Sequence, residues 1–286
     1  MTKDNFTETP NPNPKVAPIR PDIPPGEPDV DEEEARLEED LAAGHDEEQQ
    51  RYQQNKEEAH PILNITDWST NRFMGTPPER QMLVDELIPL GKATILAAPG
   101  GAGKGLLSLN LALGITLGPT GGRKFCGHDI LVEGSAVIFT AEDDMDEIHL
   151  RLNSLATQDE LAKVNGKLFV IPLPNAGGVN PIATQGPQGP EATPFFSVVK
   201  EQIKQIPDIK LIVFDPLSSF AFVDVNKDPQ AAAFVTGLMA ELATETGATV
   251  ILSHHFSKTG EVVNIRDAKN AVRGSTGLVN GVRCVF

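Results

Sequence analysis

A glycine-rich segment, Ala-Pro-Gly-Gly-Ala-Gly-Lys-Gly at 98–105, joins a short apolar run to a stretch with helical spacing. Glycines let the backbone wrap so that successive N–H groups point at phosphate oxygens, and the N-terminus of the following helix adds a favourable dipole. Lys104 is placed to reach the β- and γ-phosphates of a nucleotide. The predicted phosphate-binding residues are Pro99, Gly100, Gly101, Ala102, Gly103, Lys104 and Gly105.

Two positions depart from the usual phosphate-loop pattern, G-x-x-x-x-G-K-[ST]. Ala98 stands at the first glycine, which is a mild change, and Gly105 stands at the Ser/Thr. The missing hydroxyl ordinarily ligates magnesium, so the rate of nucleotide hydrolysis is left open. The alternative interpretation is a glycine-rich turn that binds nothing. The order of strand, loop, lysine and helix favours the phosphate loop.

The rest of the chain alternates between two kinds of segment. Short apolar, β-rich runs are separated by stretches with helical spacing, which is typical of a parallel sheet covered on both faces. We therefore predict an α/β fold with a mostly parallel sheet, and a surface loop at Asn175–Pro190. The strands are expected at 93–98, 135–140, 167–173, 210–214 and 248–253, and the helices at 105–117, 145–155, 194–205 and 229–246.

Two carboxylates follow predicted strands. Glu142 comes after the run Ser135–Thr140, where a side chain can poise water, although acidic residues at a helix N-terminus are the plainer interpretation of its neighbours. Asp215 ends four apolar residues, the pattern of a magnesium-holding aspartate, and an Asp-Pro strand exit is the alternative. In an open parallel sheet, ligands bind at the carboxyl ends of the strands, so both residues are candidates for one site.

The last predicted strand ends in His254-His255. Zinc binding and a purely structural pair are both open, but adjacent strand residues point to opposite faces, which favours one imidazole at the γ-phosphate. Further on, Arg273 and Arg283 are either surface arginines or, in a ring, groups that enter a neighbour's site.

Composition separates the N-terminal part from the rest. Residues 1–60 carry 17 acidic and 6 basic side chains, so −11 of the formal net charge of −16 lies there, and eight prolines fall in the first 30 residues. We predict a disordered acidic tail over 1–60 and a nucleotide-binding domain over 61–286. Neither a basic apolar leader nor a run of about 18 apolar residues occurs, and the two cysteines are far apart, which favours a cytoplasmic protein.

The ordered motifs APGGAGKG, FTAEDD, LIVFDPLSSF, LSHHFSK and VRGSTGLVNGVR together resemble the RepA-like branch of the RecA-type P-loop ATPases of the AAA family, whose best-known member is a hexameric plasmid replicative helicase. The resemblance implies ATP and Mg²⁺ as ligands, Lys104 on phosphate, Glu142 as catalytic base and Asp215 on magnesium, directly or through water. It also implies His255 as a γ-phosphate sensor and Arg273 as a finger acting in trans. Family members continue with further strands beyond the end of this sequence, so the ATPase domain is expected to be cut short there.

The resemblance implies a ring of identical subunits, expected to be a hexamer. The expected function is an ATP-hydrolysing motor that acts on single-stranded DNA during replication of a plasmid, phage or mobile element. A ring-forming regulator that binds nucleotide with weak or no turnover is the alternative. Gly105 favours the alternative, as does the mixed charge of the segment Phe220–Asp228. The loop Ser257–Asn270, with two lysines and an arginine, suits either DNA contact or solvent exposure.

Overall fold

The computed structural model describes residues 64–255 and 276–286. The chain divides into two compact units, Met1–Pro77 and Pro78–Phe286. The described part of the first unit holds two 3-10 helices, η1 (Ile65–Trp68) and η2 (Thr70–Phe73), and the Arg72 guanidinium lies 4.7 Å from the Trp68 ring centre. The predicted tail over 1–60 lies outside the described residues.

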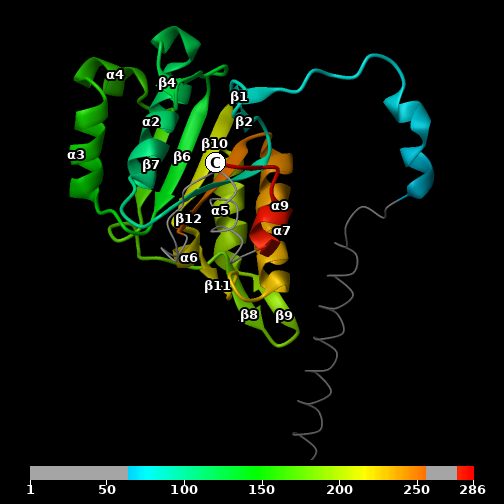
Figure 1. Cartoon of the computed structure of the whole chain (residues 1–286). Helices are drawn as coiled ribbons and strands as arrows, with labels where there is room; N and C mark the ends of the chain where they lie inside the picture. The colour runs from blue at the N-terminus through cyan, green and yellow to red at the C-terminus, as the bar shows by residue number, and fades with distance from the viewer. Residues whose placement is uncertain (1–63, 256–275) are drawn as a thin grey trace, which may run out of the picture. The chain divides into compact units, whose positions relative to one another are not determined.

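The second unit is built on a parallel sheet, which confirms the predicted α/β class. Among the described residues this sheet has six strands, and every neighbouring pair in it is parallel (Figure 1). In spatial order they are β13 (Cys284–Val285), β3 (Ala93–Ala98), β12 (Thr249–His255), β10 (Ile209–Asp215), β6 (Ser135–Thr140) and β7 (Leu168–Pro172).

Helices cover both faces of the sheet, because its central strands carry buried apolar residues on both faces. Along β6, Val137 and Phe139 pack toward one face, while Ala136 and Ile138 pack toward the other. The first face is covered by α5 (Pro194–Lys204) and α7 (Pro229–Thr246), and the second by α2 (Lys104–Leu117) and α3 (Met145–Leu155) (Figure 1). The near-continuous apolar runs in the sequence therefore indicate strands whose two faces are both buried.

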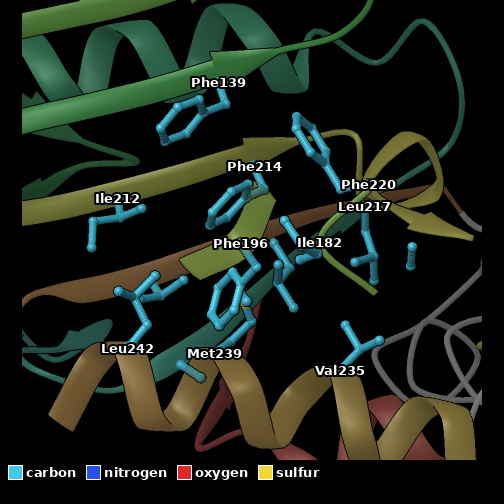
Figure 2. Packing of buried hydrophobic residues seen from close by; sticks show 14 of the residues in the cluster. Phe139, Ile182, Phe196, Ile212, Phe214, Leu217, Phe220, Val235, Met239 and Leu242 are labelled. Carbon is cyan, nitrogen blue, oxygen red and sulfur yellow. The ribbon is translucent and has the colours of Figure 1, made fainter. Parts of the chain in front are cut away.

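The larger of the two cores centres on three phenylalanines, which Figure 2 shows between the sheet and α7. The Phe214 ring stacks on Phe139 with centroids 5.2 Å apart, and it meets Phe220 edge-on at 5.3 Å. All three side chains are buried, and Met239 and Leu242 of α7 lie in the same cluster. Because Phe214 directly precedes Asp215, this packing fixes the strand end that carries the carboxylate.

Local capping explains where the helices begin. The Asp144 side chain accepts a hydrogen bond from Glu147 N at the start of α3, and Asp228 accepts one from Gln230 N ahead of Pro229 in α7. Both are preferred N-cap arrangements, and proline is favoured in the first helical turn. A glycine in the left-handed conformation, Gly247, ends α7.

The structure corrects the predicted surface loop at Asn175–Pro190. A hairpin forms there from β8 (Ala183–Gly186) and β9 (Gly189–Ala192), and β11 (Ala221–Phe222) joins it to make a second small sheet. The sequence pattern did not predict these strands because glycine and proline, which are frequent in this segment, both have low strand propensity. The other elements are β1 (Met82–Val84), β2 (Ile88–Pro89), β4 (Lys124–Phe125), β5 (His128–Asp129), α4 (Gln158–Lys163), α6 (Leu217–Phe220), α9 (Thr276–Gly281) and the 3-10 helix η3 (Pro119–Gly121).

No helix in the described ranges is long and apolar enough to span a membrane.

We predict that Phe214→Ala lowers the free energy of unfolding by about 3–5 kcal/mol, because it opens a cavity between sheet and helix where little can collapse. Urea denaturation followed by circular dichroism measures the change. Phe222→Ala is the control, since 58% of that side chain is exposed, and its expected effect is within about 0.5 kcal/mol. Equal effects of the two substitutions would contradict the assignment of Phe214 to the core.

Candidate functional site

Four neighbouring strands of the main sheet end at one edge, and each contributes to the same pocket. The order β3-β12-β10-β6 places the phosphate loop after β3, His255 at the end of β12, Asp215 at the end of β10 and Glu142 just after β6. The register aligns His255 with Ala98, and Asp215 with Thr140. Parallel pairing therefore brings together residues far apart in sequence, such as Lys104 and His255, which are separated by 151 positions.

The pocket is lined by residues from all four of these strand ends. Its lining consists of Gly101, Gly103, Lys104, Gly105, Glu142, Asp143, Arg151, Asp215 and His255. The predicted loop residues Pro99, Gly100 and Ala102 belong to the same turn but are not part of this lining. Arg273 lies outside the described residues.

The loop conformation depends on two glycines. Gly101 and Gly103 have φ values of 75° and 85°, in the left-handed region that side-chain-bearing residues rarely adopt. Gly103 is also the N-cap of α2, so the first turn of this 14-residue helix opens into the pocket. Helix N-terminal N–H groups and the helix dipole together favour an anionic ligand there.

Lys104 lies almost entirely buried at the base of the pocket, with 4% of its surface exposed. Its Nζ donates to Ala98 O at 3.2 Å and to Pro99 O at 3.3 Å, and it lies 2.9 Å from His255 Nδ1. Burial lowers the pKa of Lys104, while the carboxylates of Asp215 and Glu142 act in the opposite direction. The ammonium has three N–H donors, so these three contacts use all of them.

The contact with Lys104 fixes the tautomer of neutral His255. Because the ammonium can only donate, Nδ1 accepts and the ring hydrogen sits on Nε2. Nε2 lies 3.5 Å from Glu142 Oε1 and, within the described residues, has no hydrogen-bond partner. His254 is buried and does not line the pocket, as expected for adjacent strand residues. Burial lowers the pKa of His254, and His255 and Lys104 lower it further.

Asp215 is a buried carboxyl at the end of the central strand β10. Its backbone oxygen accepts a hydrogen bond from Ala141 N at 2.9 Å, which ties the end of β10 to the segment that carries Glu142. Burial raises the pKa of Asp215, and Glu142 raises it too, whereas Lys104 lowers it. Asp215 thus stands in an environment that disfavours its charge until a cation arrives.

Two pocket residues escaped the sequence analysis. Arg151 Nη1 donates to Asp143 Oδ2 at 2.6 Å, and Arg151 Nε donates to Glu147 Oε1 at 2.7 Å. Burial raises the pKa of Asp143, and Arg151 counteracts that shift. The spacing 143, 147, 151 was the available signal, because residues four apart lie on one side of a helix.

The donor groups of the pocket suit a magnesium ion that is bound mainly through phosphate. A methyl group placed on Gly105 would have its carbon 3.0 Å from Arg151 Nη1, 3.1 Å from Asp215 Oδ2 and 3.5 Å from Asp143 Oδ2, so a guanidinium and two carboxylates face the same space beside the loop. No cluster of three or more His, Cys, Asp or Glu suited to a metal occurs among the described residues. Mg²⁺ typically uses one or two carboxylates with substrate phosphates and water, which this set can supply.

Arg283, the second candidate finger, lies elsewhere. With Lys92 and Asn280 it lines a separate pocket. That pocket borders Ala93, the first residue of β3, whereas the phosphate loop follows the last residue of the same strand.

Comparison with known proteins shows likeness to a protein family and to solved structures. A family model described as an AAA domain matches residues 59–261, well over half of the chain. Among solved structures, a KaiC-like protein from the hyperthermophilic archaeon Pyrococcus horikoshii OT3 is similar, with 18% sequence identity and a TM-score of 0.43 over 73% of this chain and 80% of that one.

We predict that Asp215→Asn stabilises the ligand-free protein at pH 8, because it removes a buried charge next to Glu142 and Asp143. A raised native pKa means that folding favours the protonated acid. The stability contribution of Asp215 is therefore present below the unfolded pKa of about 3.9 and is lost as pH rises through the native value. Each unit of difference is worth about 1.4 kcal/mol.

Urea unfolding of both proteins between pH 5 and pH 8 measures the effect. The advantage of the Asn variant should grow with pH. A variant less stable than the unmodified protein at pH 8 would show that attraction to Lys104 outweighs burial.

Proposed function

The chain belongs to the AAA-domain family of P-loop ATPases, and on that premise we propose that it binds ATP with Mg²⁺ in the pocket at the end of β3 and hydrolyses it. The observation that supports this most directly is the meeting of Lys104, His255, Asp215 and Glu142 in one pocket beside a helix N-terminus. These groups supply a phosphate-binding cation, a metal-binding carboxylate and a candidate base.

Binding of the triphosphate requires Lys104 to exchange partners. All three of its N–H groups are directed at protein atoms, two of them at the loop carbonyls of Ala98 and Pro99. A phosphate oxygen that accepts from Lys104 therefore replaces at least one of these contacts. Replacement of the His255 contact would free Nδ1, so nucleotide binding and the position of His255 are coupled in this proposal.

Glu142 is the proposed general base. Its side chain is 60% exposed and lines the pocket, so water can reach it. Glu142 Oε1 lies 3.5 Å from Nε2 of His255, and Nδ1 of the same ring lies 2.9 Å from Lys104 Nζ, so the carboxylate is on the side of the pocket where Lys104 lies. In the proposed step, Glu142 takes the proton of the water that attacks the γ-phosphorus, and the P–O bond to the β-phosphate breaks.

Magnesium would be held by Asp215, directly or through water, and would neutralise charge on the phosphates. The raised pKa of Asp215 fits this assignment, since an arriving cation relieves the cost of a buried negative charge.

We predict that Glu142→Gln reduces steady-state ATP hydrolysis by about 10²–10⁴-fold, because it removes the base and keeps the shape of the side chain. Affinity for ATP should be unchanged, since Glu142 makes no proposed phosphate contact. A phosphate-release assay and a nucleotide titration give the two values.

Glu133→Gln is the matched control, because Glu133 is an exposed carboxylate paired with Lys167 and is not part of the pocket lining. Full hydrolysis by Glu142→Gln would mean that another group activates water.

We also expect that Lys104→Ala loses ATP binding while it remains folded, because Lys104 belongs to the same site. Retained affinity would place the nucleotide elsewhere.

The finer part of the proposal is a ring-forming motor of the RepA helicase type that acts on single-stranded DNA in replication of a plasmid, phage or mobile element. Its support is the set of motifs that resemble that branch, including Arg273 as a finger for the neighbouring subunit. The segment Phe220–Asp228 adds an exposed Phe222 and an exposed Lys227, whose nearest carboxylate is Asp224 at 3.6 Å. An exposed aromatic and an exposed cation in one segment suit base stacking and backbone contact.

We predict that oligo(dT) stimulates ATP hydrolysis and that Phe222→Ala reduces this stimulation about tenfold, since stacking of one base on an aromatic ring is worth about 1–3 kcal/mol. Val198→Ala, at an exposed apolar position on α5, is the control. The ratio of rates with and without DNA is the readout, and light scattering with ATP tests for the ring. A nucleotide-dependent ring without turnover or DNA response would favour the regulator instead.

A further inference from the structure

The space beside Gly105 is occupied by an arginine. A side-chain carbon at this position would lie 3.0 Å from Arg151 Nη1 and 3.1 Å from Asp215 Oδ2, both closer than normal packing allows. In the usual phosphate loop this position carries the hydroxyl that ligates magnesium. In this chain the glycine leaves room for a guanidinium at the same place.

Arg151 is anchored and still has donors to offer. Asp143 and Glu147 accept from Nη1 and Nε at 2.6 and 2.7 Å, which fixes the guanidinium plane from two directions. An arginine has five N–H groups, so three remain without a partner among the described residues. Arg151 lines the same pocket as Lys104, and 30% of its side chain is exposed. A purely structural ion pair would not need to lie in the pocket.

The carboxylates that line the pocket favour a second cationic side chain beside Lys104. The pocket lining contains three carboxylates, Glu142, Asp143 and Asp215, and among the described residues that line it Arg151 and Lys104 are the only arginine and lysine. A nucleotide triphosphate brings several more negative charges to this space. Without Arg151, the carboxylates next to the loop would face the phosphates across the space in which the loop hydroxyl and its metal usually lie.

We propose that Arg151 is a nucleotide-binding residue of its own subunit, which donates to the phosphates beside Gly105 and takes over there part of the role that a loop hydroxyl and magnesium share in other phosphate loops. This inference rests on the proposed nucleotide site and specifies it. Gly105 and Arg151 act as a pair, because a side chain at position 105 would push the guanidinium by a few tenths of an ångström from its place. The arginine makes nucleotide binding less dependent on Mg²⁺ than a loop with lysine alone would allow.

The test is nucleotide affinity with and without metal, measured by titration of a fluorescent ATP analogue in excess Mg²⁺ and in EDTA. Arg151→Gln should weaken binding in EDTA by about tenfold or more, since a hydrogen bond between charged groups is lost. The loss in excess Mg²⁺ should be smaller. Arg151→Lys keeps the charge but has a single nitrogen to share between Asp143 and phosphate. Its affinity in EDTA should lie between that of the unmodified protein and that of Arg151→Gln.

Arg123→Gln is the matched control. Arg123 is also partly buried and paired with a glutamate, Glu160 at 3.0 Å, but it does not line the pocket. Its loss should leave nucleotide affinity unchanged in both buffers. Thermal melting of each variant separates loss of binding from loss of folding.

The pairing with Gly105 is tested by a double-mutant cycle. Gly105→Ala should weaken binding in EDTA when Arg151 is present and should have little further effect in the Arg151→Gln protein. Equal affinity of Arg151→Gln and the unmodified protein in EDTA would overturn the inference while leaving the nucleotide site in place, and so would additive effects in the cycle. Failure of the unmodified protein to bind nucleotide even with Mg²⁺ would overturn the proposed function itself, and this inference with it.

Discussion

Strand β12 pairs with β3 on one side and with β10 on the other, and both pairings are parallel. Because parallel neighbours run in the same direction, the three strands and β6 beyond them all release the chain at one edge of the sheet. The order puts the strand of His255 between the loop of Lys104 and the strand of Asp215. The contact between Lys104 Nζ and His255 Nδ1 follows from this backbone pairing. A shift of one residue in β12 would turn His255 to the opposite face and place His254 in the pocket.

The pocket places several ionisable side chains in a partly buried space where their charged forms are disfavoured. Burial disfavours the charged forms of Lys104, Asp143 and Asp215, and the carboxylates repel one another. Such a cluster opposes folding, and it is tolerated because the two cores beneath it are continuous and apolar. The cost becomes useful when a nucleotide and a cation bind, since they restore the missing partners. Pre-organised but unsatisfied charge is what an anion-binding, metal-assisted site needs.

Gly105 has no side chain, and this absence leaves space in the pocket for groups from other elements. A glycine in the first turn of a helix is unfavourable by up to about 1 kcal/mol relative to alanine, so a spacing reason is expected for it. The neighbours found around it, Arg151, Asp215 and Asp143, provide that reason. The departure from the usual loop pattern thus coincides with a second cation from α3.

The sequence by itself determined most of the fold and the list of candidate groups. The strand 93–98, the strand 135–140 and the helix 229–246 could be located to the residue, because apolar runs and helical spacing arise from burial on two faces. The phosphate loop, Glu142, Asp215 and His255 were identified because strand ends and short motifs are local. The strands of the hairpin 183–192 were missed, since glycine and proline carry no strand signal and the strands form through pairing with each other and with β11.

What only the tertiary structure decided is how those groups meet. The partner of Lys104 lies 151 residues away, and its choice of His255 over His254 depends on strand register. Arg151 joins the site because α3 packs beside the loop, at a distance that no residue spacing encodes. Local sequence specifies elements and chemistry, whereas long-range packing sets which charges share one space, and in this protein that packing brings Arg151 to the position beside Gly105.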